Sequence, residues 1–178
     1  MTGRNIRFLK SSVTFEKSPM ENARIEIRIA TPEEYSAFCD FIFLVFGFDR
    51  KVTLEHLEKS ISQGTGQLFL MWHGTFLLGS VMMNMQRDAS GKPVVYLYSV
   101  GIHPRFQGRG IGKLMLQYVI EVGEEAIENA VFELSVREEN TRAQGFYEKM
   151  GFVSYESLGM AQTDTRPGFR QYRRIGTI

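Results

Sequence analysis

The sequence predicts a single α/β domain in which helices flank a mixed, mostly antiparallel sheet. The chain has 178 residues, of which 43% are hydrophobic and 23% charged, as is usual for one globular domain. Segments with the two-residue period of strands alternate with segments that have the helical period of 3.6 residues. Three strand segments between residues 67 and 102 are separated only by short turns, which favours antiparallel neighbours.

The chain begins with residues 1–23, which are polar and irregular, and we expect them to form an extension before one domain over residues 24–178. Residues 24–30 alternate apolar and charged side chains, as in a half-buried strand. Thr31 then provides a hydroxyl N-cap and Glu34 completes a capping box, so a helix is expected to follow.

The remaining elements follow from the same two periods, with glycine-containing turns between strands. Helices are expected at residues 32–46, 54–61 (capped by Thr53), 111–125 and 141–150. Further strands are expected at residues 67–72, 75–86, 94–102, 131–137, 152–157 and 169–175. No internal repeat or linker divides this series.

Composition excludes several classes of function. The net charge of +1 gives no field that favours a nucleic-acid partner. No apolar run approaches the roughly 20 residues of a membrane helix, and residues 1–20 lack the apolar core of a secretory signal. The single cysteine, Cys39, cannot form an internal disulfide and suits a reducing compartment, so a cytoplasmic location is expected.

The most specific pattern is the junction between the strand at 94–102 and the helix at 111–125. Its turn holds Gly108, Gly110 and Gly112. Glycines let backbone N–H groups approach a ligand closely, and a helix start adds a positive dipole end. The junction therefore predicts a cradle for phosphate or pyrophosphate, the alternative being a turn without a ligand. Its spacing fits neither the phosphate loop of nucleotide hydrolases nor the dinucleotide fingerprint.

A family resemblance lies in two blocks. The first is Gln107-Gly108-Arg109-Gly110-Ile111-Gly112, which resembles the acyl-CoA signature Q/R-x-x-G-x-G/A of the GNAT superfamily of N-acetyltransferases. The second spans residues 131–152 and places six residues at the family's spacing: Asn140, Ala143, Phe146, Tyr147, Gly151 and Phe152. The resemblance implies a sheet with one splayed parallel strand pair. It also implies acetyl transfer from acetyl-CoA to a primary amine by direct attack, with no metal.

For the donor, the resemblance implies a site made largely of main-chain groups. N–H groups at the end of the central strand would polarise the thioester carbonyl, and the glycine loop would hold the pyrophosphate. The predicted donor-binding residues are Val100, Gly101, Ile102, Gln107, Gly108, Arg109, Gly110, Ile111, Gly112, Lys113, Asn140 and Tyr147. Asn140 is also the N-cap of the helix at 141–150 by its position.

The catalytic groups are predicted less completely. Tyr147 matches the family's acid for the leaving thiolate, although its ring also fits core packing. The central strand carries no Asp or Glu, and the family's glutamate position on the next strand is Ser135, with Glu133 earlier on the same face. The base is either water held by Tyr98, Ser99 and Ser135, or His103 at the loop mouth. The catalytic candidates are therefore Tyr147, Ser135 and Ser99.

The acceptor is not identified by the sequence: a small-molecule amine, a lysine and a protein N-terminus all stay open, as does a homodimer. A cluster of aromatic residues predicts either burial or a pocket for an apolar amine: Phe38, Phe41, Phe43, Phe46 and Phe48. A basic cluster near the C-terminus is expected on a solvated edge strand: Arg166, Arg170, Arg173 and Arg174. Because acidic residues are missing from the expected positions, a CoA-binding sensor or interaction module with weak or lost catalysis is the alternative function.

Overall fold

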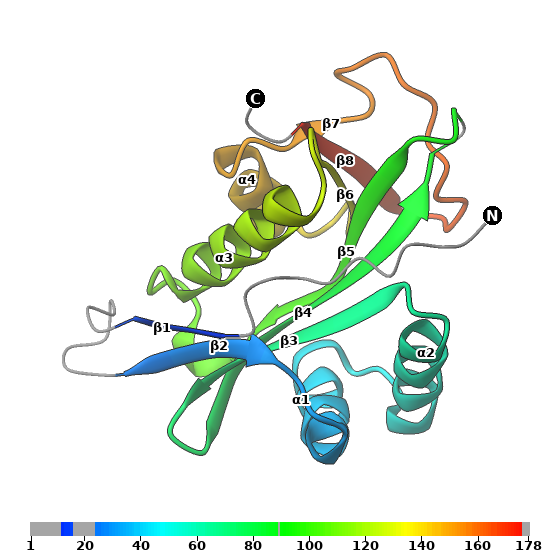
Figure 1. Cartoon of the computed structure of the whole chain (residues 1–178). Coiled ribbons are helices and arrows are strands. Elements are labelled where there is room, and N and C mark those ends of the chain that lie inside the picture. Colours follow the sequence, from blue (N-terminus) through cyan, green and yellow to red (C-terminus); the bar gives the residue numbers. More distant parts are fainter. Residues whose placement is uncertain (1–11, 16–23, 89, 176–178) are drawn as a thin grey trace.

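The computed structural model describes residues 12–15, 24–88 and 90–175, and an eight-stranded sheet runs through it (Figure 1). The strand order is β1-β2-β3-β4-β5-β6-β8-β7. The strands are β1 (Ser12–Phe15), β2 (Ile25–Ile29), β3 (Gly66–His73), β4 (Phe76–Arg87), β5 (Pro93–Ile102), β6 (Val131–Arg137), β7 (Val153–Ser154) and β8 (Phe169–Ile175). The helices are α1 (Tyr35–Phe46), α2 (Arg50–Ser62), α3 (Ile111–Ala126) and α4 (Thr141–Lys149), with single 3-10 turns η1 (Pro32–Glu34) and η2 (Pro104–Phe106).

The sheet confirms the predicted mixed, mostly antiparallel architecture. Every pair of neighbouring strands is antiparallel except β5 and β6. The parallel register joins Val95 to Phe132 and Leu97 to Leu134 and then stops, although β5 continues to Ile102. Beyond Leu97 the two strands separate, which is the predicted splayed pair.

Two hydrophobic cores cover the two faces of the sheet. On β3, Phe69 and Met71 belong to the core under α3, whereas Leu68 and Leu70 belong to the core under α1 and α2. This is the alternation expected of a strand that is buried on both faces. The faces carry different helices, with α3 and α4 on one and α1 and α2 on the other (Figure 1).

Three elements differ from the sequence prediction. The helix predicted from Leu54 begins at Arg50, because Asp49 is the N-cap and accepts a hydrogen bond from Val52 N–H at 3.0 Å. The capping prediction for Thr53 is therefore wrong. The strand predicted at 152–157 is only two residues long, since the chain turns after Ser154. Ser12–Phe15, within the polar N-terminal stretch, pairs with β2 as β1.

The position of β8 corrects a further expectation. It lies between β6 and β7 and is not an edge strand, so the basic cluster does not protect a free edge. Its arginines are instead paired across the sheet and helices. Arg173 lies 3.1 Å from Glu133, and Arg174 lies 2.9 Å from Glu124.

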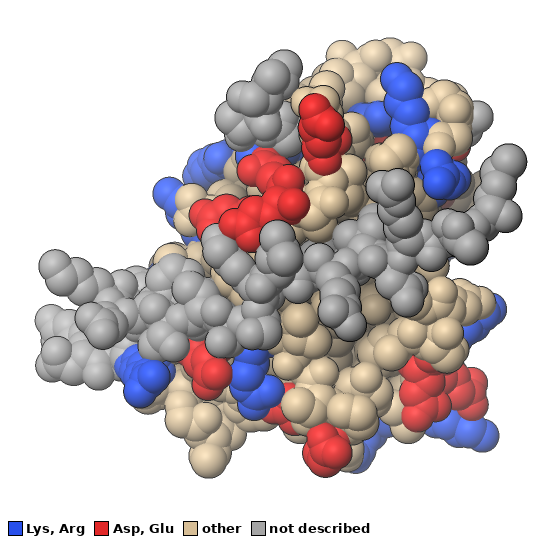
Figure 2. Space-filling model, viewed as in Figure 1, with Lys and Arg blue, Asp and Glu red and all other residues tan. Residues whose placement is uncertain are grey.

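Figure 2 shows Lys, Arg, Asp and Glu side chains on the face viewed, with acidic ones gathered over α3. Within the described ranges, no helix is long and apolar enough to span a bilayer. In the same ranges, no three or more His, Cys, Asp or Glu side chains are grouped closely enough to hold a metal ion.

Candidate active site

Two pockets meet where β5 and β6 separate. The first, which we name the glycine-loop pocket, has a volume of about 600 Å³ and lies between the end of β5, the start of α3 and α4. The second, the aromatic pocket, has a volume of about 310 Å³ and is lined by α1, α2, β5 and β6. Five residues line both pockets: Phe46, Val100, Asn140, Ala143 and Tyr147. Ligands bound in the two pockets would therefore meet at these residues.

The loop before α3 presents a row of unpaired main-chain donors. Gly108 and Gly110 have φ values of 80° and 77°, a left-handed conformation that other residues rarely adopt. The N–H groups of Lys113 and Leu114 donate to the Gly110 carbonyl at 3.1 and 3.3 Å. Among the residues that the structure describes, none accepts a hydrogen bond from the N–H groups of residues 108–112. These free donors and the positive end of the α3 dipole are the features that favour an anion at this position.

The end of β5 turns its main chain toward the same gap. A bulge in β5 lies between the Ser80–Gly101 and Met82–Tyr98 pairs of β4 and β5, and Ser99 at this bulge has a φ of 51°. The buried Ser80 hydroxyl donates to the Ser99 carbonyl at 2.9 Å and so fixes the bulge. His103 N–H donates to the Leu78 carbonyl of β4 at 2.8 Å, so the preceding N–H, that of Ile102, points away from β4 and into the gap.

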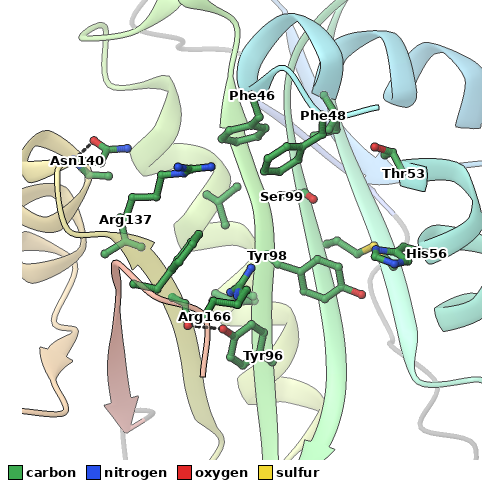
Figure 3. A pocket seen from close by; sticks show the side chains of 18 of the residues that line it. Phe46, Phe48, Thr53, His56, Tyr96, Tyr98, Ser99, Arg137, Asn140 and Arg166 are labelled. Atoms are coloured by element: carbon green, nitrogen blue, oxygen red, sulfur yellow. Dashed lines mark hydrogen bonds between the residues drawn. The ribbon is translucent and has the colours of Figure 1, made fainter. Parts of the chain in front are cut away.

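Aromatic rings and two cationic side chains line the aromatic pocket together (Figure 3). Phe46 and Phe48 stack with ring centroids 5.5 Å apart, and their side chains are 39% and 46% exposed. Arg137, at the end of β6, and Arg166, in the segment before β8, extend into the pocket from the side opposite His56 of α2. Within the described part of the chain, no Asp or Glu lines this pocket.

A carboxylate outside the pocket lining fixes Arg166. The Arg166 Nε donates to both oxygens of Asp164 at 2.9 and 3.2 Å, and Nη2 donates at 2.6 Å. The Tyr96 hydroxyl donates to Ser135 Oγ at 2.6 Å, and the Ser135 side chain lies near Asp164, where it helps to lower the pKa of that carboxyl. The hydrogen bond from Arg166 holds the pKa of the Asp164 carboxyl well below its usual range. Asp164 is therefore anionic at neutral pH and orients Arg166.

Tyr147 of α4 lies where the two pockets join. Its side chain is 8% exposed, and its ring centroid lies 5.4 Å from that of Phe146 and 5.8 Å from that of Phe152. Burial raises the pKa of its hydroxyl well above the usual value. No described residue forms a hydrogen bond with that hydroxyl. Tyr147 thus combines core packing with a neutral donor at the junction, as both sequence interpretations allowed.

Comparison with known proteins identifies the family. Residues 31–152, more than half of the chain, match the model of the acetyltransferase (GNAT) family. The chain belongs to the acetyltransferase (GNAT) family. The resemblance predicted from the two sequence blocks is therefore confirmed.

Solved structures share this GNAT fold at low sequence identity. A GNAT acetyltransferase from Staphylococcus aureus Mu50 is 20% identical, with a TM-score of 0.70 and coverage of 86% of this chain and 99% of that chain. Arabidopsis thaliana Naa50, in complex with the bisubstrate analogue CoA-Ac-MVNAL, is 17% identical, with a TM-score of 0.64 and coverage of 84% and 97%. The GNAT domain of S. lividans PAT is 12% identical, with a TM-score of 0.66 and coverage of 92% and 96%. These similarities concern the fold.

The structure gathers most of the predicted GNAT donor residues around one pocket. The glycine-loop pocket is lined by Val100, Gly101, Ile102, Gln107, Gly108, Gly110, Gly112, Lys113, Asn140 and Tyr147. Two predicted residues do not line it. Arg109 lies over the Phe106 ring at 5.6 Å, and Ile111 is fully buried in the core, so only their main-chain groups belong to the loop. Asn140 is the N-cap of α4, as expected, and its Oδ1 accepts from Ala143 N–H at 3.1 Å.

The candidates for the base fall into two groups. Tyr98, Ser99 and Ser135 line the aromatic pocket. His103 lines neither pocket. It caps η2 through Nδ1, which accepts from Arg105 N–H at 3.3 Å. Glu133 is also outside, because it accepts the Tyr155 hydroxyl at 2.5 Å and pairs with Arg173. His103 and Glu133, both considered from the sequence, therefore lie away from the junction of the two pockets.

The predicted burial of the aromatic cluster in and just after α1 holds for only two of its members. Phe38 and Phe41 are buried at 1% and 4% exposure. Phe43, by contrast, is 57% exposed, and Phe46 and Phe48 line the aromatic pocket. Burial on all sides fails because α1 packs with one face on the sheet and leaves the other free.

Sequence reasoning missed four side chains around the junction. Arg142 lines the glycine-loop pocket, and its Nη1 donates to Gln107 Oε1 at 3.2 Å. Lys149 also lines this pocket. Arg142 and Lys149 are seven residues apart, which places them on one face of α4, and this spacing could have identified both from the sequence. His56 and Arg137 line the aromatic pocket, but a single histidine on an exposed helix and an arginine at a strand end give no such signal.

Proposed function

We propose that this GNAT acetyltransferase transfers the acetyl group of acetyl-CoA to a primary amine by direct attack. The proposal rests on one observation above all: the five consecutive N–H groups of residues 108–112 have no acceptor among the described residues and lie beside the glycine-loop pocket. They suit the pyrophosphate of coenzyme A, with Lys113 and Arg142 adding positive charge in the same lining.

The acyl end of the donor would lie in the gap between β5 and β6. The N–H of Ile102 points into this gap, where it can donate to the thioester oxygen and to the oxyanion that forms on attack. The bulge at Ser99 supports this role, because it rotates the last residues of β5 relative to β4. Main-chain donors would thus carry both binding and carbonyl polarisation.

The amine would approach from the aromatic pocket, which shares Tyr147 and Val100 with the glycine-loop pocket. Two guanidiniums, and a described lining without Asp or Glu, favour a neutral amine over an ammonium ion, so the pocket itself promotes loss of the proton. Imidazole is the commonest general base in enzymes, and in the described part of this lining His56 is the histidine. We therefore assign proton removal to His56, directly or through water held by Ser99 and Ser135.

Tyr147 would stabilise the leaving thiolate. A phenol whose pKa is raised by burial stays protonated at neutral pH, so its hydroxyl can donate a hydrogen bond to the thiolate. Its raised pKa also lies above that of a thiol, so donating the hydrogen bond is easier than giving up the proton. The thiolate takes up one proton, which balances the one lost by the amine, and leaves as the free thiol.

A CoA-binding module with lost catalysis is the alternative function. The observation that favours it is the aromatic pocket, whose described lining holds no Asp or Glu to act as a base. Binding of acetyl-CoA is common to both functions, so turnover has to separate them.

The test uses the full chain in two steps. Calorimetric titration with acetyl-CoA and with ATP checks the donor, and we expect binding of acetyl-CoA only. Release of free thiol is then measured with a panel of amines that spans polyamines, amino acids, lysine peptides and protein N-termini. Thiol release that depends on one amine class supports the transferase. Binding of acetyl-CoA without thiol release from any amine would support the binding module instead.

A further inference from the structure

Two arginines of the aromatic pocket converge on one ring. The guanidinium carbons of Arg137 and Arg166 lie 5.5 and 4.2 Å from the centroid of Phe169. Both side chains line the pocket and extend into it in Figure 3. Because no Asp or Glu lines this pocket in the described part of the chain, the charge presented to a ligand here is positive.

The two guanidiniums are held differently. The Arg166 guanidinium forms three hydrogen bonds with Asp164, whose side chain is 9% exposed. Arg166 is therefore held in one orientation, and the Asp164 carboxylate balances most of its charge. Arg137 has one carboxylate partner, Glu139, at 3.5 Å, and these side chains are 56% and 69% exposed. Such an exposed pair is weak and easily exchanged. Arg137 is therefore the cation that a ligand can recruit.

We propose that the acceptor amine carries a carboxylate, which binds between Arg137 and Arg166. A guanidinium presents its N–H groups as a planar fork that matches a carboxylate. Binding the carboxylate would replace the weak contact of Arg137 with Glu139 by a partner inside the pocket. The inference rests on the proposed acetyl transfer and names the substrate class for it.

The rest of the pocket suggests a small amino acid with an apolar side chain. Its volume of about 310 Å³ is at the lower end of small-molecule sites. Phe46 and Phe48 provide an apolar wall, and Tyr147 marks the junction that the amine has to reach. Arg137 lies three residues before Asn140, which lines both pockets, so a carboxylate held by Arg137 would lie on the junction side of the aromatic pocket. An α-amino acid is the smallest acceptor that carries both a carboxylate and an amine.

The same features disfavour other amines. Polyamines and lysine-rich peptides would bring further positive charge toward two guanidiniums, which opposes binding. A neutral amine without an anionic group would leave the recruitable donors of Arg137 without a new partner.

The kinetic test compares α-amino acids with their α-amides, which differ only in the carboxylate. For the best apolar amino acid, we expect kcat/KM in the thiol-release assay to exceed that of its amide by about tenfold or more. Arg137→Gln should remove this preference by raising KM for the acid and leaving the amide unchanged. Arg170→Gln is the matched control, because Arg170 pairs with Glu138 and Glu156 and lines neither pocket.

Three results of the kinetic test would overturn the inference. One is an amide, or the decarboxylated amine, that is as good a substrate as the acid in the wild type. Another is preference for an amine with a phosphate group, tested with phosphoethanolamine against ethanolamine. The third is a peptide N-terminus that is a better substrate than every free amino acid.

A binding measurement separates failure of the inference from failure of the proposed function. Calorimetric titration of the CoA-bound protein with the same acids and amides does not require turnover. Binding of the acids that is lost in Arg137→Gln, without thiol release, would support the carboxylate site and contradict acetyl transfer. Thiol release from amides or polyamines alone would support acetyl transfer and contradict the carboxylate site. If the acids neither bind nor react, the carboxylate site is wrong.

Discussion

The two pockets that meet at Tyr147 are built from different parts of the chain. The glycine-loop pocket takes the groups that we propose bind the pyrophosphate from one short segment, residues 108–112, and they are main-chain N–H groups. The aromatic pocket takes its groups from seven separate elements and the segment before β8, and they are side chains. A short motif can encode the first kind of site, because glycine positions fix the backbone locally. The second kind exists only after the sheet has brought distant residues together.

This contrast makes each pocket sensitive to a different kind of substitution. Changes to backbone geometry or charge in the glycine loop should affect the donor and leave the acceptor site intact. Changes to side chains of the aromatic pocket should do the reverse. Substitutions at the junction should change kcat more than they change the affinity for the donor or for the acceptor.

The largest effect is expected from a carboxylate in the glycine loop, introduced as Gly110→Asp. Aspartate is a good helix N-cap and tolerates a left-handed backbone better than most residues, so the fold should persist. Its charge would repel the pyrophosphate, and we expect the affinity for CoA to fall about 100-fold in calorimetry at low salt. Gly74→Asp is the control, because Gly74 has a φ of 58° with no atoms near its Cβ position. Equal CoA affinity in the two variants would show that the loop is not the anion site.

The next largest effect is expected from Tyr147→Phe at the junction. Loss of one hydrogen bond to a developing thiolate should lower kcat between about 10- and 100-fold. The affinity for acetyl-CoA should change by less than about threefold, since the ring and its packing remain. Tyr35→Phe, at the first residue of α1 and only partly buried against the core, should leave both quantities unchanged. Full kcat in Tyr147→Phe would remove this residue from the reaction.

A smaller effect, confined to the acceptor, is expected from Asp164→Asn. Without the carboxylate, Arg166 loses its fixed orientation, and KM for the acceptor should rise about fivefold while acetyl-CoA affinity stays constant. Asp40→Asn, at an exposed ion pair with Arg50, is the control. A change in acetyl-CoA affinity of similar size would contradict the separation of the two pockets.

Asp164 also predicts a pH dependence of stability. Its pKa is lower in the folded protein than the value of about 3.9 in an unfolded chain. The stabilisation it provides is therefore present above about pH 4 and is lost as the pH falls below that value. Urea unfolding should show wild type more stable than Asp164→Asn at pH 7, with a gap that narrows toward pH 3. A gap that widens in acid would contradict the lowered pKa.

The smallest effect is expected from Ser99→Gly, although Ser99 is a catalytic candidate from the sequence. Glycine adopts the φ of 51° without strain, so activity should stay within about threefold of wild type. Ser99→Val should cost at least about tenfold, because a β-branched residue disfavours this backbone conformation and would shift the bulge. A loss in Ser99→Gly as large as in Ser99→Val would assign the function to the hydroxyl.

Sequence reasoning reached the parts of the fold that depend on local patterns. The helix and strand periods placed most elements within a few residues, and the glycine spacing predicted the loop before α3. Local patterns could not reveal that β8 inserts between β6 and β7, since strand order depends on long-range pairing. Nor could local patterns show that the Asp164–Arg166 pair lies beside Ser135. That proximity requires β6 and the segment before β8 to be neighbours.

The measurement that tests the central claim most directly is a titration of ¹⁵N-labelled protein with CoA, followed by NMR. If the N–H groups of residues 108–112 bind the pyrophosphate, their resonances should show the largest shifts, in the direction of stronger hydrogen bonding. Pantetheine, which lacks the pyrophosphate, should leave these resonances nearly unchanged. Saturation with CoA without shifts in these five resonances, or equal shifts with pantetheine, would contradict the proposed donor site.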